Sequence, residues 1–456
     1  MAQTITKTYS TAGSFNIRFP SDVTSVQAQM WGGGGGAGGV SGTKSGGGGG
    51  AGGAYVVSSV TVTAGVAYPV VVGAGGTAGA AAANGGSGDA SWFAVVGSAL
   101  APGGNFGTGG SGNNTGYGGG AGGTTGAIGT LAYMGGTATT GTTGVGGGAG
   151  GGGASDTGVG GNASGLTGGT GALTGGGAGG NARGTAGGAG IAGTAYGGGA
   201  GGPYSNNTTD RAGAVGGAGA VVLSYSTSDV DIYSIGSVTI DNAAAGTIVY
   251  TVPSGYTQTG LLVGVLCYCF PSQSGAKIAT ITLGTQSPVA KIQQVGPAGM
   301  NTYSEWWYLA SPLSGIGSIV ITPSAPLAYI RGIAMTLLNV GTSQADATSG
   351  TTNTSTATTS VSITTVTDRS IVFSGVQDAT GSSGPTPSSP QITLYNPDIT
   401  DIFSYTQAKT PAGTVTHTYS GGAASDSWDD AIISIYPYPV AAGSFFPMRT
   451  LLGVGT

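Results

Sequence analysis

One hexapeptide, Gly-Gly-Gly-Ala-Gly-Gly, recurs six times in this chain and constrains its fold more than any other feature. Glycine loses more backbone freedom on folding than other residues and offers no side chain to pack. Such a segment is therefore either disordered or held by hydrogen bonds between close-packed extended chains. Repetition of one hexamer favours order, because a flexible linker does not need it. The copies begin at Gly34, Gly48, Gly118, Gly146, Gly175 and Gly197.

The glycine-rich region carries few charges, whereas disordered chains usually carry many. Residues 32–219 contain Lys44, Asp89, Asp156, Arg183, Asp210 and Arg211 and no other charged side chain. We expect polyglycine II rods, since this geometry has three residues per turn and leaves every N–H and C=O group to neighbouring chains. No Gly-X-Y period runs through the region, which excludes collagen. The single alanine of each hexamer is expected to face outward or toward a looser contact.

β-Patterning surrounds the glycine-rich region and dominates the rest of the chain. Residues 1–31, 54–72 and 221–225 alternate as strands and are expected to frame a glycine-rich domain over 1–225. From 226 to 440, short alternating runs separated by turn residues indicate one jelly-roll-like β-sandwich. The expected fold is thus all-β plus polyglycine II, in which an N-terminal polyglycine II sandwich precedes the β-sandwich, and an apolar tail over 441–456 ends the chain.

Charge and hydropathy limit the classes of partner. The net charge of −5 argues against nucleic-acid binding, which needs a basic face. No apolar run reaches 18 residues, so no membrane insertion is expected. The N-terminal residues lack a basic segment followed by an apolar one, so no secretory signal peptide is expected either.

Few residues in this chain could perform acid–base chemistry. His417 and Glu305 are the only residues of their types. His417 lies in an alternating strand pattern, which favours a structural role, and Cys267 and Cys269 are expected to be small buried apolar side chains. We therefore expect no enzyme.

Two motifs in the second half leave alternatives open. Asp426, Asp429 and Asp430 indicate a solvated turn, with a calcium site as the alternative. No other cofactor is expected. In the pair Trp306 and Trp307, strand alternation would send one side chain into the core and expose the other. The exposed one could stack on a sugar, although core or interface packing is the more common role.

The segments between hexamers hold most of the aromatic and asparagine residues of the glycine-rich region. Any one of them could simply reverse the chain, but as a set they favour recognition, because loops on a rigid scaffold commonly bind ligands. Tyrosine and tryptophan also give large contact areas at low entropic cost. The predicted binding residues are Trp92, Phe93, Phe106, Tyr117, Tyr133, Tyr204, Asn206 and Asn207.

Residues 4–225 resemble the glycine-rich domain of bacteriophage tail-fibre adhesins. The resemblance is carried by FNIRFPSDVTSVQAQMWGGGGGAGG, by GGGGGAGGAYVVSSVTVTAGVAYPVVVGAGG and by the hexamers up to GGAGAVVLSY. It implies packed polyglycine II helices as scaffold, with the loops between them binding the host surface. In the tip adhesins of this kind a fibre-attachment domain precedes the glycine-rich region, whereas here a sandwich follows it.

The expected function is that of a non-enzymatic bacteriophage virion protein, a fibre or receptor-binding adhesin. The alternatives are a purely structural capsid decoration, head fibre or extracellular filament subunit, and a hydrolase of surface polysaccharide, for which clustered carboxylates are missing. Expected partners are other phage structural proteins and a host polysaccharide or outer-membrane protein. A homo-oligomer is expected, with a trimer as the candidate assembly, on the virion surface after synthesis in the host cytoplasm.

Overall fold

The computed structural model divides into two compact units, which are described separately. The rod domain comprises Thr4–Phe19 and Val23–Ser226, and the sandwich unit is formed mainly by the chain from Thr227 onward. The expected tail over 441–456 lies outside the described residues. These are 2–122, 126–172, 175–243, 245–256, 258–269, 276–296, 301–341, 347–354, 356–378, 384–397, 400–421 and 426–438.

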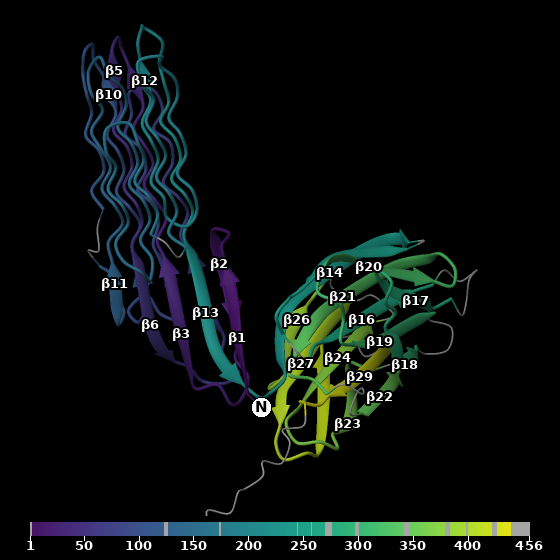
Figure 1. Cartoon of the computed structure of the whole chain (residues 1–456). Helices are drawn as coiled ribbons and strands as arrows, with labels where there is room; N and C mark the ends of the chain where they lie inside the picture. Colours follow the sequence, from purple (N-terminus) through teal and green to yellow (C-terminus); the bar gives the residue numbers. More distant parts are fainter. Residues whose placement is uncertain are drawn as a thin grey trace, which may run out of the picture. The chain divides into compact units, whose positions relative to one another are not determined.

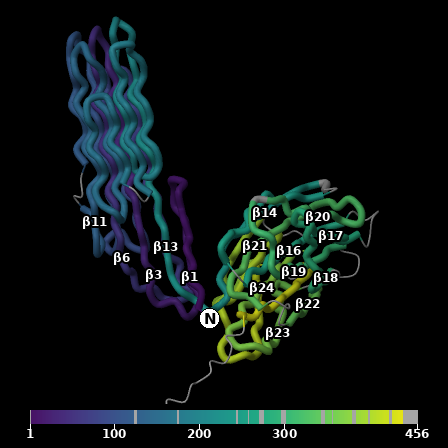
Figure 2. The backbone as a smooth tube through the Cα atoms, viewed as in Figure 1, coloured from purple at the N-terminus to yellow at the C-terminus, as the bar shows by residue number. Residues whose placement is uncertain are grey.

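The rod domain is a bundle of extended glycine-rich rods that lie side by side (Figures 1 and 2). In rod 32–40, the N–H groups of Gly33, Gly36 and Gly39 donate to one neighbour, at 2.8–2.9 Å. The other two sets of N–H groups, also spaced by three residues, donate to two further rods. The receiving rods are 83–90, 46–54 and 211–219. The carbonyl groups of rod 32–40 accept hydrogen bonds from rods 73–80, 102–110 and 197–204.

This period of three confirms the predicted polyglycine II packing, because a three-residue turn directs every third peptide group toward the same neighbour. A Cβ atom added at Gly120 would lie 2.3 Å from the carbonyl oxygen of Asn105, and one at Gly177 would lie 2.1 Å from that of Thr194. No side chain fits at such contacts. Glycine is therefore required wherever one rod faces another.

The hexamer alanines occupy both of the environments expected for them, an outward face in two copies and a looser contact in the other four. Ala121 and Ala178 are exposed, but the other four alanines are fully buried. Ala37 and Ala200 cluster with Ala214 where their three rods meet and bond to one another. A methyl group fits in the gap between three rods, although it cannot fit between two. The buried hexamer alanines are Ala37, Ala51, Ala149 and Ala200.

Strands continue the rods at one end of the rod domain (Figure 1). They form a five-stranded sheet of order β1-β13-β3-β6-β11 and a four-stranded sheet of order β2-β7-β8-β9. The rings of Phe19 and Phe93 meet edge to face in the buried core of this end, with centroids 6.1 Å apart. The strands are β1 Gln3–Tyr9, β2 Gly13–Ile17, β3 Ser25–Trp31, β6 Tyr55–Thr61, β7 Tyr68–Val72, β8 Ser91–Phe93, β9 Leu100–Ala101, β11 Leu131–Tyr133 and β13 Ala220–Thr227.

The sandwich unit contains two consecutive sandwiches where the sequence analysis expected one. The first has a five-stranded sheet of order β14-β21-β16-β19-β18 and a three-stranded sheet of order β15-β20-β17. The second has β22-β29-β24-β27-β26 and β23-β28-β25. Counted from its own first strand, each therefore has the jelly-roll-like order 1-8-3-6-5 and 2-7-4.

The strands of the first sandwich are β14 Asp231–Ala243, β15 Gly246–Val252, β16 Gly260–Tyr268, β17 Ile278–Leu283, β18 Val289–Val295, β19 Thr302–Ala310, β20 Gly315–Pro323 and β21 Leu327–Leu338. Those of the second are β22 Ala347–Asn353, β23 Thr358–Thr364, β24 Ser370–Asp378, β25 Thr386–Pro387, β26 Ile392–Tyr395, β27 Asp401–Lys409, β28 Thr414–Ser420 and β29 Trp428–Ile435.

The two five-stranded sheets pack face to face, so each is covered on both sides. One apolar cluster joins Leu266 and Trp306 of the first sandwich to Phe373 and Ile433 of the second. Every residue of β24 and β29 is buried as a result. The expectation that one of the adjacent tryptophans is exposed is wrong for the same reason: Trp306 contacts the second sandwich, and Trp307 lies in the core of the first. No helix in the described residues is long and apolar enough to span a membrane.

Candidate functional site

The rods end in a set of turns at the end of the rod domain opposite its two sheets. Figure 1 shows this end beside the short strands β5 (Ser45–Gly46), β10 (Gly110–Ser111) and β12 (Tyr204–Ser205). Hydrogen bonds between antiparallel rods bring the turns to one end. We call these turns the tip surface, which consists of residues 41–45, 80–83, 111–115, 142–146, 164–167, 184–187 and 205–210.

Neighbouring turns brace one another through polar contacts. The Thr43 N–H donates to Asn113 Oδ1 at 2.8 Å, and the Asn114 N–H donates to the Thr43 carbonyl oxygen at 2.8 Å. Thr143 Oγ1 in turn donates to the Asn114 carbonyl oxygen at 2.9 Å. Lys44 adopts a left-handed backbone conformation (φ 53°) and is exposed. The turn over 41–45 therefore presents the Lys44 cation on a backbone that the neighbouring turns hold in place.

The turn over 205–210 is held by its own side chains. Ser205 Oγ lies 2.6 Å from the carbonyl oxygen of Asn207 and 2.8 Å from that of Thr209. The Thr209 N–H donates to Asn207 Oδ1 at 2.9 Å, and Asn206 Nδ2 lies 3.2 Å from the carbonyl oxygen of Ala186 in the adjacent turn. Asn206 and Asn207 are nevertheless exposed, so the turn offers polar groups on a fixed backbone.

Four of the predicted binding residues lie at or near the tip surface. Asn206 and Asn207 belong to it, and Tyr117 flanks it, with its ring against Gly110. Tyr204 lies beneath the turn in β12 and is only 2% exposed, so the expectation that it is an exposed loop residue is wrong. It is buried because β12 pairs with β5 inside the bundle.

The other four predicted residues do not join this group. Trp92 and Phe93 lie in β8 at the sheet end, where Phe93 is fully buried against Phe19, so its expected exposure is also wrong. Tyr133 lies in β11 and packs beside Trp31 in a second aromatic cluster. Phe106 is 37% exposed on the side of rod 102–110. The sequence indicated that aromatic residues cluster between hexamers, but alternate turns lie at opposite ends of the rods.

Sequence reasoning did not single out the cations of the tip surface. Lys44 lies in it, while Arg183 and Arg211 are the residues next to two of its turns. They are the three cations among residues 32–219. Of the acids in this range, Asp210 lies in the tip surface, whereas Asp89 precedes β8 and Asp156 lies in the turn after rod 146–154, both at the sheet end. The sequence could have revealed these positions if the direction of each rod had been used to assign every charged residue to one end of the bundle.

Residues 9–226 match a family model described as a glycine-rich domain. Over these residues the rod domain is similar to that family. The match ends at Ser226, where the rod domain ends, so it does not extend into the chain from Thr227 onward. A comparison with curated proteins gives no match.

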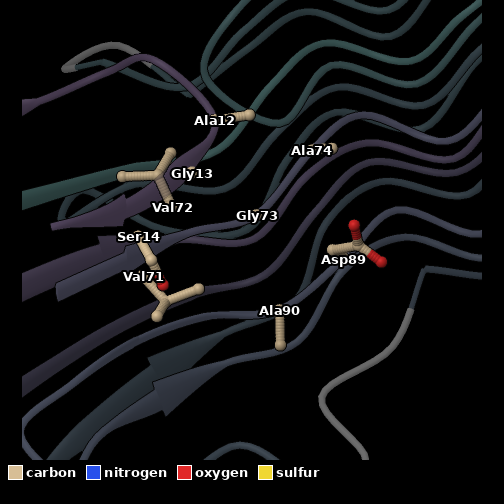
Figure 3. Close-up of a pocket in the computed structure, with 9 residues that line it drawn as sticks. All are labelled: Ala12, Gly13, Ser14, Val71, Val72, Gly73, Ala74, Asp89 and Ala90. Atoms are coloured by element: carbon tan, nitrogen blue, oxygen red, sulfur yellow. The ribbon is translucent and has the colours of Figure 1, made fainter. Parts of the chain in front are cut away.

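The rod domain also has an open depression of about 470 Å³ at the sheet end (Figure 3). Asp89 is the only titratable side chain that lines it. A single carboxylate without a second acid or base supplies no acid–base pair. The lining consists of Ala12, Gly13, Ser14, Val71, Val72, Gly73, Ala74, Asp89 and Ala90.

The three aspartates in and just before β29 do not form the expected solvated turn. Asp426, Asp429 and Asp430 are all buried, and the last two lie in β29 with side chains on opposite faces. Burial raises the pKa of Asp430 to about 7, although Thr359 Oγ1 donates to its Oδ2 at 2.6 Å. Among the described residues, no group of three or more His, Cys, Asp or Glu side chains is placed to hold a metal ion.

The only histidine is buried inside the second sandwich. His417 Nδ1 contacts Ser374 Oγ and its Nε2 contacts Thr406 Oγ1, both at hydrogen-bond distance. Burial lowers its pKa to about 4, which keeps the ring neutral. This burial in β28 agrees with the predicted strand setting of His417. Cys267 and Cys269 are free and buried, as predicted, and burial raises the pKa of Cys269 to about 11.

Proposed function

We propose that this chain is a non-enzymatic structural protein of a bacteriophage virion, and that the tip surface of its rod domain contacts the host cell surface. The observation that carries the proposal is the rigid lattice that presents polar turns together at one end. Rods of glycine have few side chains with which to discriminate ligands, so recognition falls to the turns. The resemblance of residues 4–225 to tail-fibre adhesins supports the phage setting.

The bracing of the turns favours binding. A loop that is already ordered loses less conformational entropy when a ligand binds. The hydroxyl and amide groups at Thr143, Asn206 and Asn207 can exchange hydrogen bonds with water for bonds to a host polysaccharide or an outer-membrane protein. Other virion proteins would bind this chain at surfaces outside the tip. The protein would lie on the surface of the virion as a homo-oligomer, for which we propose a trimer.

The test is binding of the fluorescently labelled full chain to a panel of bacterial strains. Thr208→Trp places a bulky side chain on the tip surface, and Thr61→Trp places the same side chain at the sheet end; both positions are exposed. We expect Thr208→Trp to reduce binding to the recognised strain at least tenfold and Thr61→Trp to leave it unchanged. If both variants bound as well as the parent chain, and Val249→Trp in the sandwich unit did not bind, the binding site would lie on the sandwich unit instead. Binding to no strain would favour the capsid or filament role.

A further inference from the structure

We infer that the tip surface binds an anionic surface glycan, a polymer that carries phosphate or carboxylate groups between its sugars. This inference rests on the proposed function, and it adds the chemical class of the ligand. It follows from the distribution of charge along the rods, the anchoring of the tip cations and the polar groups around them.

The two ends of the rods differ in charge. The tip end holds Lys44, Arg183 and Arg211 against Asp210, a net charge of +2. The sheet end holds Asp89 and Asp156, which Lys7 of β1 and Arg18 after β2 balance. The rods between these ends carry no charge, and the whole chain has a net charge of −5. A positive end on an acidic chain attracts anions to that end and orients them there.

Two of the cations are held in place near their base. The Arg211 backbone exchanges hydrogen bonds with Val40, at 2.8 and 2.9 Å, while its Nε is buried and has no hydrogen-bond partner. Arg183 Nε donates to the Ala189 carbonyl oxygen at 2.8 Å, and its side chain lies against Gly188. A guanidinium group has further N–H donors besides Nε, and these can bond to anionic oxygens.

The residue types fit a glycan with charged groups. Arginine presents a planar set of donors that matches carboxylate and phosphate oxygens, and lysine supplies a compact charge. The neighbouring Asn113, Thr143 and Asn206 supply amide and hydroxyl groups for sugar hydroxyls. Since these cations are on different turns, a polymer with repeated charges can engage several at once, which a single small anion cannot do.

The experiment measures binding of the full chain to immobilised long-chain polyphosphate, polygalacturonate and neutral dextran, at about 50 and 300 mM salt. The test variant is Lys44→Gln/Arg183→Gln. Its matched control, Lys277→Gln/Lys409→Gln, removes the same charge from the sandwich unit. We expect the parent chain to bind one or both polyanions but not dextran. Binding should be at least tenfold weaker in the test variant, which lacks two of the tip cations. It should also be at least tenfold weaker at high salt, because salt screens exposed charges. The control should bind as the parent chain does. Comparison of the two polyanions identifies the preferred charged group.

Equal loss in both double variants, or equal binding to dextran, would overturn the inference. A far-ultraviolet circular dichroism melt of each variant verifies that it is folded. The same variants are then added to the recognised bacterial strain. Cell binding that survives Lys44→Gln/Arg183→Gln would overturn the anionic ligand while leaving the proposed adhesin function intact. Failure of the parent chain to bind any strain would instead contradict the adhesin function.

Discussion

The rod domain and the sandwich unit fill their interiors with opposite kinds of residue. In the rods, peptide groups pack directly against peptide groups, and the buried positions are occupied mainly by glycine, with some alanine methyls. In the sandwich unit, large side chains such as Trp306, Phe373 and Phe403 fill the space between sheets. Backbone hydrogen bonds satisfy buried polar groups in both regions. In the rods, however, they are also the contacts that hold neighbouring elements together.

This difference reverses the effect of changing side-chain size. A rod contact has no room for an added atom, whereas a sandwich core is weakened when atoms are removed and a cavity remains. The rods should therefore be sensitive to every enlargement at a contact position. The sandwich unit should be sensitive to truncation, and its exposed positions should tolerate both.

The largest effect is expected from Gly120→Val. A Cβ atom there would lie 2.3 Å from a carbonyl oxygen of the adjacent rod, and valine adds two further carbons. We expect the rods to lose their packing, so that amide hydrogen exchange, slow in the parent hexamers, becomes fast through residues 32–219 while the sandwich unit remains protected. Gly118→Val in the same hexamer is the matched control, because the nearest atom to its added Cβ is Thr108 Oγ1, at 3.4 Å. Slow exchange in Gly120→Val would show that this rod is not close-packed.

Truncation of Trp306 is expected to have the next largest effect. Its side chain is fully buried between the two five-stranded sheets, and its Nε1 donates to the Ala431 carbonyl oxygen at 3.1 Å. Trp306→Ala should lower the free energy of unfolding of the sandwich unit by about 3–5 kcal/mol. Denaturant unfolding measures this loss, with exchange in the rods unchanged. Val249→Ala, at a position 78% exposed, is the control; a comparable loss there would contradict the assignment of the core.

Much of the rod domain was predictable because its physics is local. A rod of glycine can satisfy its peptide groups only through neighbours, so the six hexamers predicted polyglycine II packing directly. The destinations of individual turns were not predictable, since they depend on how many residues each rod contains. Phe93 and Tyr204 were misplaced for that reason: alternate connections lie at opposite ends, and short strands such as β8 and β12 bury residues that appear to lie in loops.

For the sandwich unit, the fold class was predictable from the sequence, but the number of sandwiches was not. Alternation indicates strands, but it does not give their order in a sheet, and the same short runs fit one sandwich or two. Both faces of β29 are buried, which the sequence does not reveal. Asp429 and Asp430 belong to this mostly apolar strand, although acidic residues usually lie at the surface. Of the candidate site, Asn206 and Asn207 were correctly predicted as exposed, whereas the tip cations become apparent only when rod direction is known.

Asp430 should make the sandwich unit dependent on pH in a direction unusual for aspartate. Its pKa is about 7 in the folded state and about 3.9 in an unfolded chain. The folded state therefore binds the proton more tightly, and stability falls as pH rises from about 4 to 7. Asp430→Asn removes this penalty and should stabilise the unit by about 4 kcal/mol at pH 8 relative to the parent chain, with little gain at pH 4.

The measurement is the difference in unfolding free energy between Asp430→Asn and the parent chain across pH 4–8. His417 titrates in the same window with the opposite sign, because its lowered pKa makes the folded state less stable as pH falls from about 6.5 to 4. His417 is present in both proteins, so its contribution cancels in the difference. A gain that did not grow with pH would show that Asp430 is ionised at low pH in the folded protein.

The smallest effects are expected on the tip surface, where turns face solvent. Asn114 has a left-handed backbone conformation (φ 55°), which glycine also adopts readily. Asn114→Gly should change the unfolding free energy of the rod domain by less than about 0.5 kcal/mol, whereas Asn114→Val should cost about 1–2 kcal/mol through backbone strain alone. In both variants the rods should keep their slow amide exchange, because strain in one turn does not enter a rod contact. If Asn114→Gly instead released exchange throughout the rods, the braced turns would be holding the lattice together, and the division between a scaffold of rods and a recognition surface of turns would fail.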